Sequence, residues 1–406
     1  MELEVWGLSE DLREIFTDFI QKKSIFLNKE ALTPTYLPES LLHRNNQIKQ
    51  LGTILAPLLR DEIPSNILVF GFTGVGKTIV AKYVSGELEQ MAKKHGKRVK
   101  PIYINCKMEK INTQYRLLAR LATELGQLVP MTGLPTDQVY QTFLRLLNHK
   151  NQNLLVILDE IDSMDQASNA LYDLTRVNYE ITNGSRVCVI GISNKLNFMQ
   201  DLDPKVRSSF SGEELVFPPY NALQLQDILK QRAEKAFLPG VAPLNIISKC
   251  SALAAQEHGD ARRALTLLRV SAEVADRKGA NRVVEEHVGI AAEKLEIEGT
   301  CNVVRTLPKQ SQALLWAILN LNSSDQDLAT GDVYDQYSTT CNEIGLSPLT
   351  QRRVSDLLSE LDILGIINTK VISKGRYGRT RDIHLALTEK TLLKTTQILK
   401  EELLID

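Results

Sequence analysis

The sequence predicts an α/β protein built on a doubly wound parallel sheet, followed by a small helical domain and a C-terminal winged helix. Three observations predict this organisation. Continuous apolar runs alternate with helical patterns between about residues 40 and 215, which is typical of a parallel sheet covered on both faces. Only helical periodicity remains over residues 221–300. Three helical stretches and a hairpin then follow from residue 309.

The expected strands are four short apolar runs, at residues 67–70, 101–105, 154–158 and 187–192. Pro218 and Pro219 then break the chain, and the next region repeats apolar residues at helical spacing, as in Ala261, Ala264, Leu265 and Leu268. A joint is expected near residues 300–308. We therefore expect four parts: an extension at 1–24, an α/β domain at 25–220, a helical lid at 221–303 and a winged helix at 304–406.

Composition excludes several classes of protein. Lys plus Arg total 48 against 49 Asp plus Glu, so the net charge gives no indication of nucleic-acid binding. One face of the protein can still be basic. The acidic N-terminus is unlike a secretory signal, and no apolar stretch reaches the roughly 18 to 20 residues that span a bilayer. The five cysteines are scattered, without metal-site spacing. We expect free thiols in a cytoplasmic protein that has no membrane partner.

A glycine-rich motif, GFTGVGKT, occupies residues 71–78 directly after the first apolar run. Its spacing is that of a phosphate loop, in which backbone N–H groups and a helix N-terminus face an anion. Lys77 supplies a charge to the phosphates and Thr78 offers a hydroxyl to Mg²⁺. The motif predicts binding of ATP or ADP with Mg²⁺, and the expected nucleotide-binding residues are Gly71, Thr73, Gly74, Val75, Gly76, Lys77, Thr78 and Ile79.

Two carboxylates, Asp159 and Glu160, end the apolar run at 154–158. Ligands of doubly wound sheets lie at the carboxyl ends of the strands, so Asp159 is expected to hold Mg²⁺ and Glu160 to orient or deprotonate the attacking water. An acidic helix cap would explain the pair equally well without the phosphate loop. With that loop about 80 residues earlier, the pair predicts hydrolysis of the nucleotide.

Two further polar positions can reach the phosphates. Asn194 follows the run at 187–192 and can hold the lytic water or the γ-phosphate, although a turn-forming asparagine is the competing interpretation. Arg262 and Arg263 begin a helix of the lid, from which an arginine could couple lid closure to the nucleotide. Their spacing alone does not separate these two arginines, and a solvated or DNA-facing pair remains an alternative.

The C-terminal region carries basic residues where a winged helix would contact DNA. The helical stretches are 309–321, 330–344 and 349–362, followed by a hairpin with a glycine-rich tip and a last helix. A recognition helix in the major groove with a basic wing on the phosphates would use such residues. The expected DNA-binding residues are Arg352, Arg353, Lys374, Arg376, Tyr377, Arg379 and Arg381. A winged helix that binds protein is the alternative.

Together these residues resemble the archaeal origin-recognition and cell-division-cycle initiator proteins, which are AAA+ ATPases with a winged helix. Besides the phosphate loop, the resemblance rests on Gly259-Asp260-Ala261-Arg262, on Phe217-Pro218-Pro219-Tyr220, and on a segment at 32–48 that would lie against adenine. The motifs at 105–107, 113–116 and 125–133 are similar to the family's helical insertion, near 108–138. That insertion would contact DNA beside the winged helix.

The resemblance implies roles residue by residue. Asn194 becomes the first sensor and Arg262 the second, while Tyr220 and Arg232 join the nucleotide-binding residues. Many relatives carry an arginine where this chain has Lys205, two positions before Arg207. Lysine does not replace a planar arginine at a phosphate, so Arg207 is a second candidate beside Lys205 for contacting ATP on a neighbouring molecule.

The function that the resemblance implies is an ATP-regulated replication initiator that binds double-stranded origin DNA. It would be a slow ATPase acting as a switch, associated with the nucleoid, that helps to recruit or load the minichromosome maintenance helicase, with paralogous initiators as further partners. Three alternatives stay open: a nucleotide-switch signalling ATPase whose winged helix binds protein, a mobile-element or helicase-accessory ATPase, and a paralogue that regulates initiation.

Overall fold

The computed structural model describes Leu12, Phe16, Thr17 and residues 23–165, 167–195, 197–210, 212–321, 328–373 and 379–405. It divides the chain into two compact units, Met1–Val288 and Gly289–Asp406. The boundary between them falls within one long helix, α12 (Glu285–Thr306). The helix also passes the boundary expected at residue 303, so no loop separates the helical lid from the winged helix at that point.

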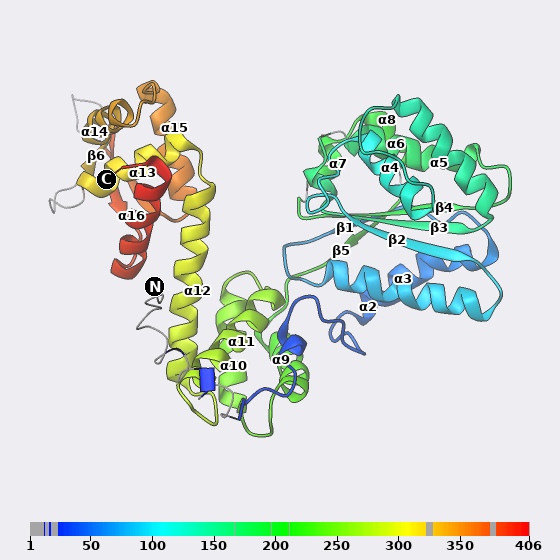
Figure 1. Ribbon diagram of the computed structural model, residues 1–406, viewed down its shortest axis with the longest axis horizontal. Helices are drawn as coiled ribbons and strands as arrows, with labels where there is room; N and C mark the ends of the chain where they lie inside the picture. The colour runs from blue at the N-terminus through cyan, green and yellow to red at the C-terminus, as the bar shows by residue number, and fades with distance from the viewer. Residues whose placement is uncertain are drawn as a thin grey trace, which may run out of the picture. The chain divides into compact units, whose positions relative to one another are not determined.

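The first unit contains a five-stranded parallel sheet with the order β2-β3-β4-β1-β5 (Figure 1). The strands are β1 (Ile67–Phe70), β2 (Val99–Asn105), β3 (Asn153–Asp159), β4 (Val187–Ser193) and β5 (Glu213–Val216). The doubly wound sheet is therefore confirmed, with β2 at one edge and β5 at the other. The fifth strand, β5, was not among the expected apolar runs because only Leu215 of its EELV sequence is buried.

Helices cover both faces of this sheet. On one face, α2 (Asn45–Leu55) and α3 (Lys77–Lys94) pack on the side chains of Val69, Leu155 and Ile190. The opposite face, with Leu68, Val156 and Val189, lies under α4 (Gln114–Glu124), α5 (Thr136–Lys150) and α6 (Ala167–Arg176). Since side chains alternate along a strand, every residue of β1, β3 and β4 is buried on one side or the other. The part of this unit before the lid also contains short helices: η1 (Lys29–Leu32), η2 (Ala56–Arg60), η3 (Ile161–Ser163), η4 (Val177–Tyr179), α7 (Phe198–Asp201) and α8 (Pro204–Ser209).

The lid begins after the proline pair with α9 (Ala222–Ala236), α10 (Leu244–Gln256) and α11 (Ala261–Arg277). Asn221 and Gln224 form a capping box at the start of α9, and Asp260 caps α11. The N-terminal segment packs here too, because Phe26 pairs with Phe237 and η1 contacts α9. The cap on α11 fixes where this helix starts, which places Arg262 in its first turn.

The second unit is a winged helix, as the sequence predicts. It comprises α13 (Lys309–Leu321), β6 (Leu328–Ala329), α14 (Thr330–Glu343), α15 (Gln351–Ile363), β7 (Ile367–Ser373), β8 (Arg379–Leu385) and α16 (Glu389–Leu403). The three strands form an antiparallel sheet in the order β6-β8-β7. The core of the unit is built from α13, α14 and α15 around the fully buried Tyr337 and Leu358.

Two general expectations can be compared with the structure. All five cysteines are free thiols and buried. Of the helices in the described ranges, none is both long and apolar enough to cross a bilayer.

Candidate functional site

The phosphate loop joins β1 to α3, which begins at Lys77. Gly74 and Gly76 have φ values of +70° and +95°, in the left-handed region that side chains disfavour. A β-carbon on Gly76 would also lie 2.8 Å from the hydroxyl oxygen of Tyr220. The glycines are therefore required by the backbone path, which turns the N-terminus of α3 toward the cavity described below.

Lys77 is buried at the bottom of this loop. Its Nζ donates hydrogen bonds to the carbonyls of Gly71 and Phe72, both at 2.7 Å, and to Oδ1 of Asn194 at 2.8 Å. Burial is the main reason why the pKa of Lys77 falls to about 8, and the charge of Arg262 lowers it further. The ammonium group is thus held ready for an anion, in a place where positive charge is poorly solvated.

Asp159 ends β3 beside the phosphate loop. Its Oδ2 accepts hydrogen bonds from Thr78 Oγ1 at 2.7 Å and from the Tyr103 hydroxyl at 2.8 Å, and its Oδ1 accepts from the Glu160 backbone N–H at 3.0 Å. A threonine hydroxyl against a carboxylate offers the hard oxygen ligands that Mg²⁺ prefers. These two residues therefore fit the metal of a nucleotide complex, with water completing its coordination.

Glu160 follows directly, with a left-handed backbone (φ 52°) that costs about 1–2 kcal/mol in a residue other than glycine. This turn directs the chain into η3 while leaving Glu160 on the lining of the cavity. Asn194 lines the same cavity from the end of β4, and its backbone N–H donates to Asp162 at 3.3 Å. The structure thus brings the carboxyl ends of the parallel strands β1, β3 and β4 together around this cavity.

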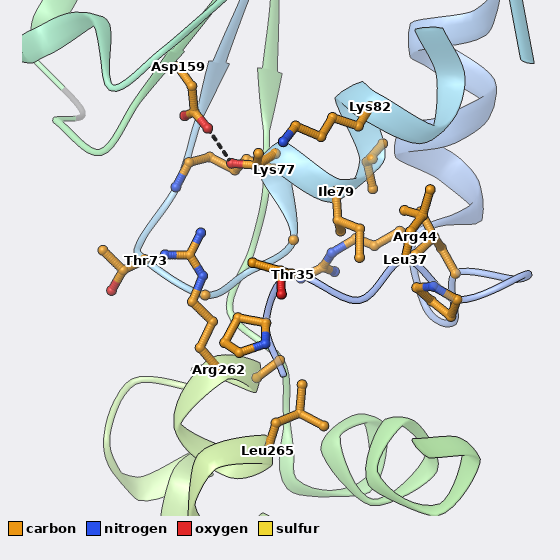
Figure 2. Close-up of a pocket in the computed structure, with 18 of the residues that line it drawn as sticks. Thr35, Leu37, Arg44, Thr73, Lys77, Ile79, Lys82, Asp159, Arg262 and Leu265 are labelled. Atoms are coloured by element: carbon orange, nitrogen blue, oxygen red, sulfur yellow. Dashed lines mark hydrogen bonds between the residues drawn. The ribbon is translucent and has the colours of Figure 1, made fainter. Parts of the chain in front are cut away.

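A cavity of about 670 Å³ opens between these strand ends and the lid. Lys77 and Arg262 lie at one part of it, beside the phosphate loop, and Figure 2 shows Arg262 projecting from the lid toward that loop. Away from these charges the lining is apolar and comes from the 32–48 segment, from α3 and from the lid: Pro34, Leu37, Leu41, Ile79, Ile228 and Leu265. A charged part beside an apolar part suits a nucleotide, with phosphates in the first and the base in the second.

The lid separates the two arginines that spacing left unresolved. Arg262 lines the cavity, whereas Arg263 forms an ion pair with Glu257, with Nε 2.8 Å from Oε2. Asp260, which caps this helix, lies against Gly74, and the Ala261 N–H donates to the Gly74 carbonyl at 3.2 Å. The first turn of α11 is consequently seated on the phosphate loop.

Two buried arginines hold the 32–48 segment in place. Arg44 donates to the carbonyls of Val75, at 2.9 Å, and Pro218, at 2.7 Å, and its guanidinium lies 3.7 Å from the ring centre of Tyr220. Arg232 of α9 donates to the carbonyls of Ala31 and Tyr36. Arg232 and Tyr220 both line the cavity. Arg44 connects the phosphate loop to the proline junction before the lid, and burial lowers its pKa.

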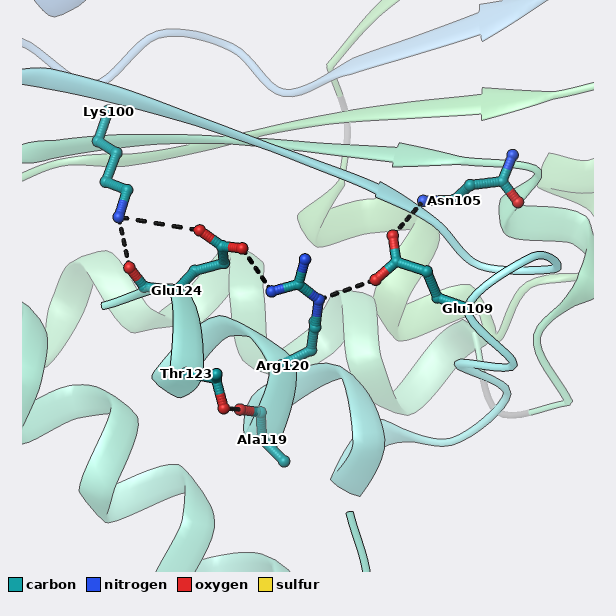
Figure 3. Close-up of polar contacts among 7 residues, drawn as sticks. All are labelled: Lys100, Asn105, Glu109, Ala119, Arg120, Thr123 and Glu124. Carbon is teal, nitrogen blue, oxygen red and sulfur yellow. Dashed lines mark hydrogen bonds and ion pairs between the residues drawn. The ribbon is translucent and has the colours of Figure 1, made fainter. Parts of the chain in front are cut away.

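The expected insertion, near 108–138, consists of a loop, helix α4, a second loop and the first residues of α5. Ion pairs within the insertion include a residue of the cavity lining (Figure 3). Glu109, on the cavity lining, pairs with Arg120 Nε at 2.8 Å, and Arg120 also pairs with Glu124 at the end of α4. Glu109 additionally accepts from the Asn105 N–H at 3.2 Å. The insertion is therefore attached directly to the wall of the site.

Of the expected DNA-binding residues, Arg352 and Arg353 lie exposed in the first turn of α15. The guanidinium of Arg381 donates instead to Ser355 and Ser359 of α15, at 3.3 and 2.7 Å, and so ties β8 to that helix. Arg379 begins β8, but its side chain, like the whole of Lys374, Arg376 and Tyr377, lies outside the described residues. The expected contact between Arg381 and DNA stays a prediction, although its guanidinium is engaged within the unit.

Arg207 is exposed on α8 and does not belong to the lining of the cavity. Its expected contact with a neighbouring molecule stays a prediction. Sequence reasoning missed Tyr103 and Lys82, which pack on each other with Lys82 Nζ 3.6 Å from the Tyr103 ring centre. Tyr103 lay inside an expected strand, and no local signal shows that its hydroxyl reaches a carboxylate 56 residues further on.

Comparisons with known proteins agree with this architecture. Residues 61–199 match the family model of an AAA domain, residues 226–293 that of the Cdc6 AAA+ ATPase-type lid domain, and residues 302–395 that of the CDC6 C-terminal winged helix domain. The solved structure of the Aeropyrum pernix ORC1 protein in complex with DNA has a TM-score of 0.80 and 42% identity, covering 94% of this chain and 98% of that one.

Sequence relatives cover nearly the whole chain. The ORC1-type DNA replication protein 1 of Methanosarcina acetivorans is 50% identical over 394 residues, which are 95% of this chain and 94% of that protein. The ORC1-type DNA replication protein of Pyrococcus furiosus is 50% identical over 384 residues, 93% of this chain and 91% of that protein. This chain therefore belongs to the ORC1-type DNA replication proteins, the archaeal origin-recognition and Cdc6 family of AAA+ proteins with a winged helix.

Proposed function

We propose that this protein is an ATP-regulated initiator of DNA replication that binds double-stranded origin DNA. One observation carries the proposal: Lys77, Asp159 and Glu160 line a cavity together with Arg262 of the lid. The same chain has a winged helix in which the first turn of α15 carries exposed arginines. A site suited to ATP and a DNA-binding fold thus occur in one polypeptide. The relative from Aeropyrum pernix, solved in complex with DNA, supports the second half of the proposal.

ATP would place its phosphates on the phosphate loop and its base against the apolar lining from the 32–48 segment. Mg²⁺, held near Thr78 and Asp159, would neutralise charge on the phosphates. Glu160 would orient and deprotonate the attacking water, Asn194 would help to place it, and Arg262 would report the γ-phosphate to the lid. Slow turnover would make the site a switch, because differing contacts of ATP and ADP bias lid closure.

DNA would be held by the winged helix and by the insertion at 108–138, so the nucleotide-binding domain would share in deforming the origin. The DNA-binding residues of this proposal are Arg352, Arg353, Lys374, Arg376, Tyr377, Arg379 and Arg381. The proposal includes the division of the chain into parts at 1–24, 25–220, 221–303 and 304–406. The DNA-bound protein, associated with the nucleoid in the cytoplasm, would help to recruit or load the minichromosome maintenance helicase. Paralogous initiators would be further partners, and Arg207 of this chain would contact the ATP bound to such a neighbour.

The test of DNA binding is fluorescence anisotropy of labelled duplexes, origin-derived and scrambled, over a salt series with ADP and with a non-hydrolysable ATP analogue. We expect tighter binding of the origin duplex and a dependence on the nucleotide. Equal, purely salt-driven binding to both duplexes would leave a helicase-accessory or other general DNA-associated ATPase. No binding at low salt would favour the signalling ATPase.

The test of hydrolysis is Glu160→Gln, which keeps the size of the side chain and removes its basicity. We expect ATP affinity near that of the unmodified protein and turnover reduced at least about a hundredfold, the low end of general-base contributions. Unchanged turnover would remove Glu160 from the proposed role. Retention of helicase on origin DNA, compared between the protein and this variant, tests the proposed partner.

A further inference from the structure

The Asp159 carboxylate has a hydrogen-bond donor that belongs to no nucleotide-binding motif. Tyr103 donates its hydroxyl to Oδ2 at 2.8 Å, beside the 2.7 Å hydrogen bond from Thr78. The third donor is the Glu160 N–H, on Oδ1. The carboxylate is therefore fixed from both sides, and Tyr103 is the one donor among these that comes from the neighbouring strand, β2.

Strand register explains how Tyr103 reaches this position. In the parallel pair β2–β3, Asn105 is opposite Asp159 and Tyr103 is opposite Ile157. Residues two apart on a strand share a face, so Tyr103 and Asp159 lie on the same side of the sheet. This is the side covered by α3, and the long tyrosine side chain leans along the strand to meet the carboxylate.

Helix α3 contacts the ring of Tyr103 through Lys82. Lys82, four positions after Thr78 and thus on the same face of α3, places Nζ 3.6 Å from the centre of the Tyr103 ring. A cation over an aromatic face is attracted by the ring, and it draws electron density from the phenol, which makes the hydroxyl a stronger donor. Figure 2 shows Lys82 reaching back along α3 toward Asp159 and Lys77.

We propose that Tyr103, with Lys82 on its ring, is a positioning residue that orients Asp159 for Mg²⁺ in the nucleotide complex. The inference rests on the proposed function, since it concerns the metal of the ATP site. Partners that hold a metal-binding carboxylate commonly change metal affinity or activity 10- to 100-fold when removed. Tyr103 acts through Asp159, so its effect belongs to the metal and not to the nucleotide itself.

The test is Tyr103→Phe, measured by the affinity for a fluorescent ATP analogue in EDTA and over a Mg²⁺ series. We expect unchanged affinity in EDTA, which also shows that the variant is folded. The Mg²⁺ concentration that gives half of the metal-dependent gain in affinity should rise about tenfold, the low end of that range, because Thr78 and the Glu160 N–H would still hold the Asp159 carboxylate. The control is Tyr140→Phe, which removes a tyrosine hydroxyl that donates to Glu180 at 2.7 Å outside the site.

A second pair of variants tests the stacked cation. Lys82→Met should reproduce the shift in Mg²⁺ requirement, and Lys82→Arg, which stacks well on aromatic rings, should restore it. If Lys82→Met instead weakens binding in EDTA, Lys82 contacts the phosphates directly and its proposed role is wrong. An unchanged Mg²⁺ series in Tyr103→Phe would overturn the inference alone. An unmodified protein that binds no ATP analogue would overturn the proposed function as well.

Discussion

Asp260 of the lid lies directly against Gly74 of the phosphate loop: a β-carbon on Gly74 would come within 1.6 Å of Oδ1 of Asp260. The same oxygen caps α11 by accepting from the backbone N–H groups of Arg262, at 2.7 Å, and Arg263, at 3.2 Å. The helix that carries Arg262 therefore starts on the phosphate loop. Any side chain at Gly74 would push the two apart.

Gly74→Ala should weaken nucleotide binding at least about tenfold, a loss of 1.4 kcal/mol, because it displaces the lid from the loop. The φ of +70° adds strain of about 1–2 kcal/mol, so the free energy of unfolding should also fall. Titration with a fluorescent nucleotide and urea unfolding followed by circular dichroism measure the two effects.

Gly86→Ala is the matched control, since Gly86 lies within α3 and a β-carbon there meets nothing within 4 Å. This change should raise the free energy of unfolding by about 0.5–1 kcal/mol and leave nucleotide affinity unchanged. If Gly74→Ala bound nucleotide as the unmodified protein does, the seat of the lid on the loop would not matter for binding.

The pKa of Lys77, lowered to about 8 mainly by burial, predicts pH-dependent nucleotide binding. Below pH 8 the ammonium is charged and attracts phosphate. Between 8 and the ordinary pKa of 10.5 it is neutral in the empty site, so phosphate binding must recover a proton and affinity should fall. In the same interval the unfolded chain binds more protons than the folded chain, so the free energy of unfolding should rise with pH.

Affinity measured from pH 7 to 9.5, with proton uptake read by calorimetry in buffers of different ionisation enthalpy, checks this prediction. Lys77→Arg is the control, because a guanidinium stays charged over the whole range. Its affinity is expected to be lower and its pH profile flatter. If affinity depended on pH equally in both proteins, the proton taken up on binding would belong to a group other than Lys77.

Arg44 predicts a loss of stability that does not depend on charge. Arg44→Lys keeps the charge but cannot donate to Val75 and Pro218 together while lying flat on Tyr220. A buried carbonyl left without its donor costs about 1–3 kcal/mol, and urea unfolding should show a loss of that order. Arg60→Lys, at an exposed position, is the control and should change stability by less than about 0.5 kcal/mol. Equal stabilities would contradict the bridging role of Arg44.

Local patterns predicted much of the site because they arise within one turn of chain. The glycines of the phosphate loop and the carboxylates that end β3 are each set by a strand and the residues that follow it. The expected strands did not include β5, because only one of its residues is buried and its sequence therefore has no apolar run. No loop marks residue 303, because α12 is continuous there.

Contacts between distant segments could not be read from the chain. Tyr103 meets Asp159 only through the register of β2 on β3, and Arg44 meets Pro218 across 174 positions. Spacing alone does not separate Arg262 from Arg263: the family resemblance names Arg262, and the contact of α11 with the phosphate loop places Arg262 on the cavity lining. The hydrogen bonds of Arg381 to Ser355 and Ser359 of α15 are a further contact that no local pattern shows.

Arg381 and Arg352 should therefore separate stability from DNA binding. Arg381→Ala leaves the Ser355 carbonyl and the Ser359 hydroxyl without their donor, which should lower the stability of the winged helix by about 1–3 kcal/mol. Arg352→Ala, at an exposed position in α15, should leave stability within about 0.5 kcal/mol.

The chain has two tryptophans, and Trp316 lies in the core of the winged helix. In a Trp6→Phe background, urea unfolding followed by tryptophan fluorescence therefore reports on this unit. In DNA titrations, Arg352→Ala should weaken binding and reduce the salt slope by about one unit, as expected for one lost phosphate contact. Unaltered stability in Arg381→Ala together with a reduced salt slope would instead assign Arg381 to DNA, because a guanidinium bound only to α15 releases no counterions from the duplex.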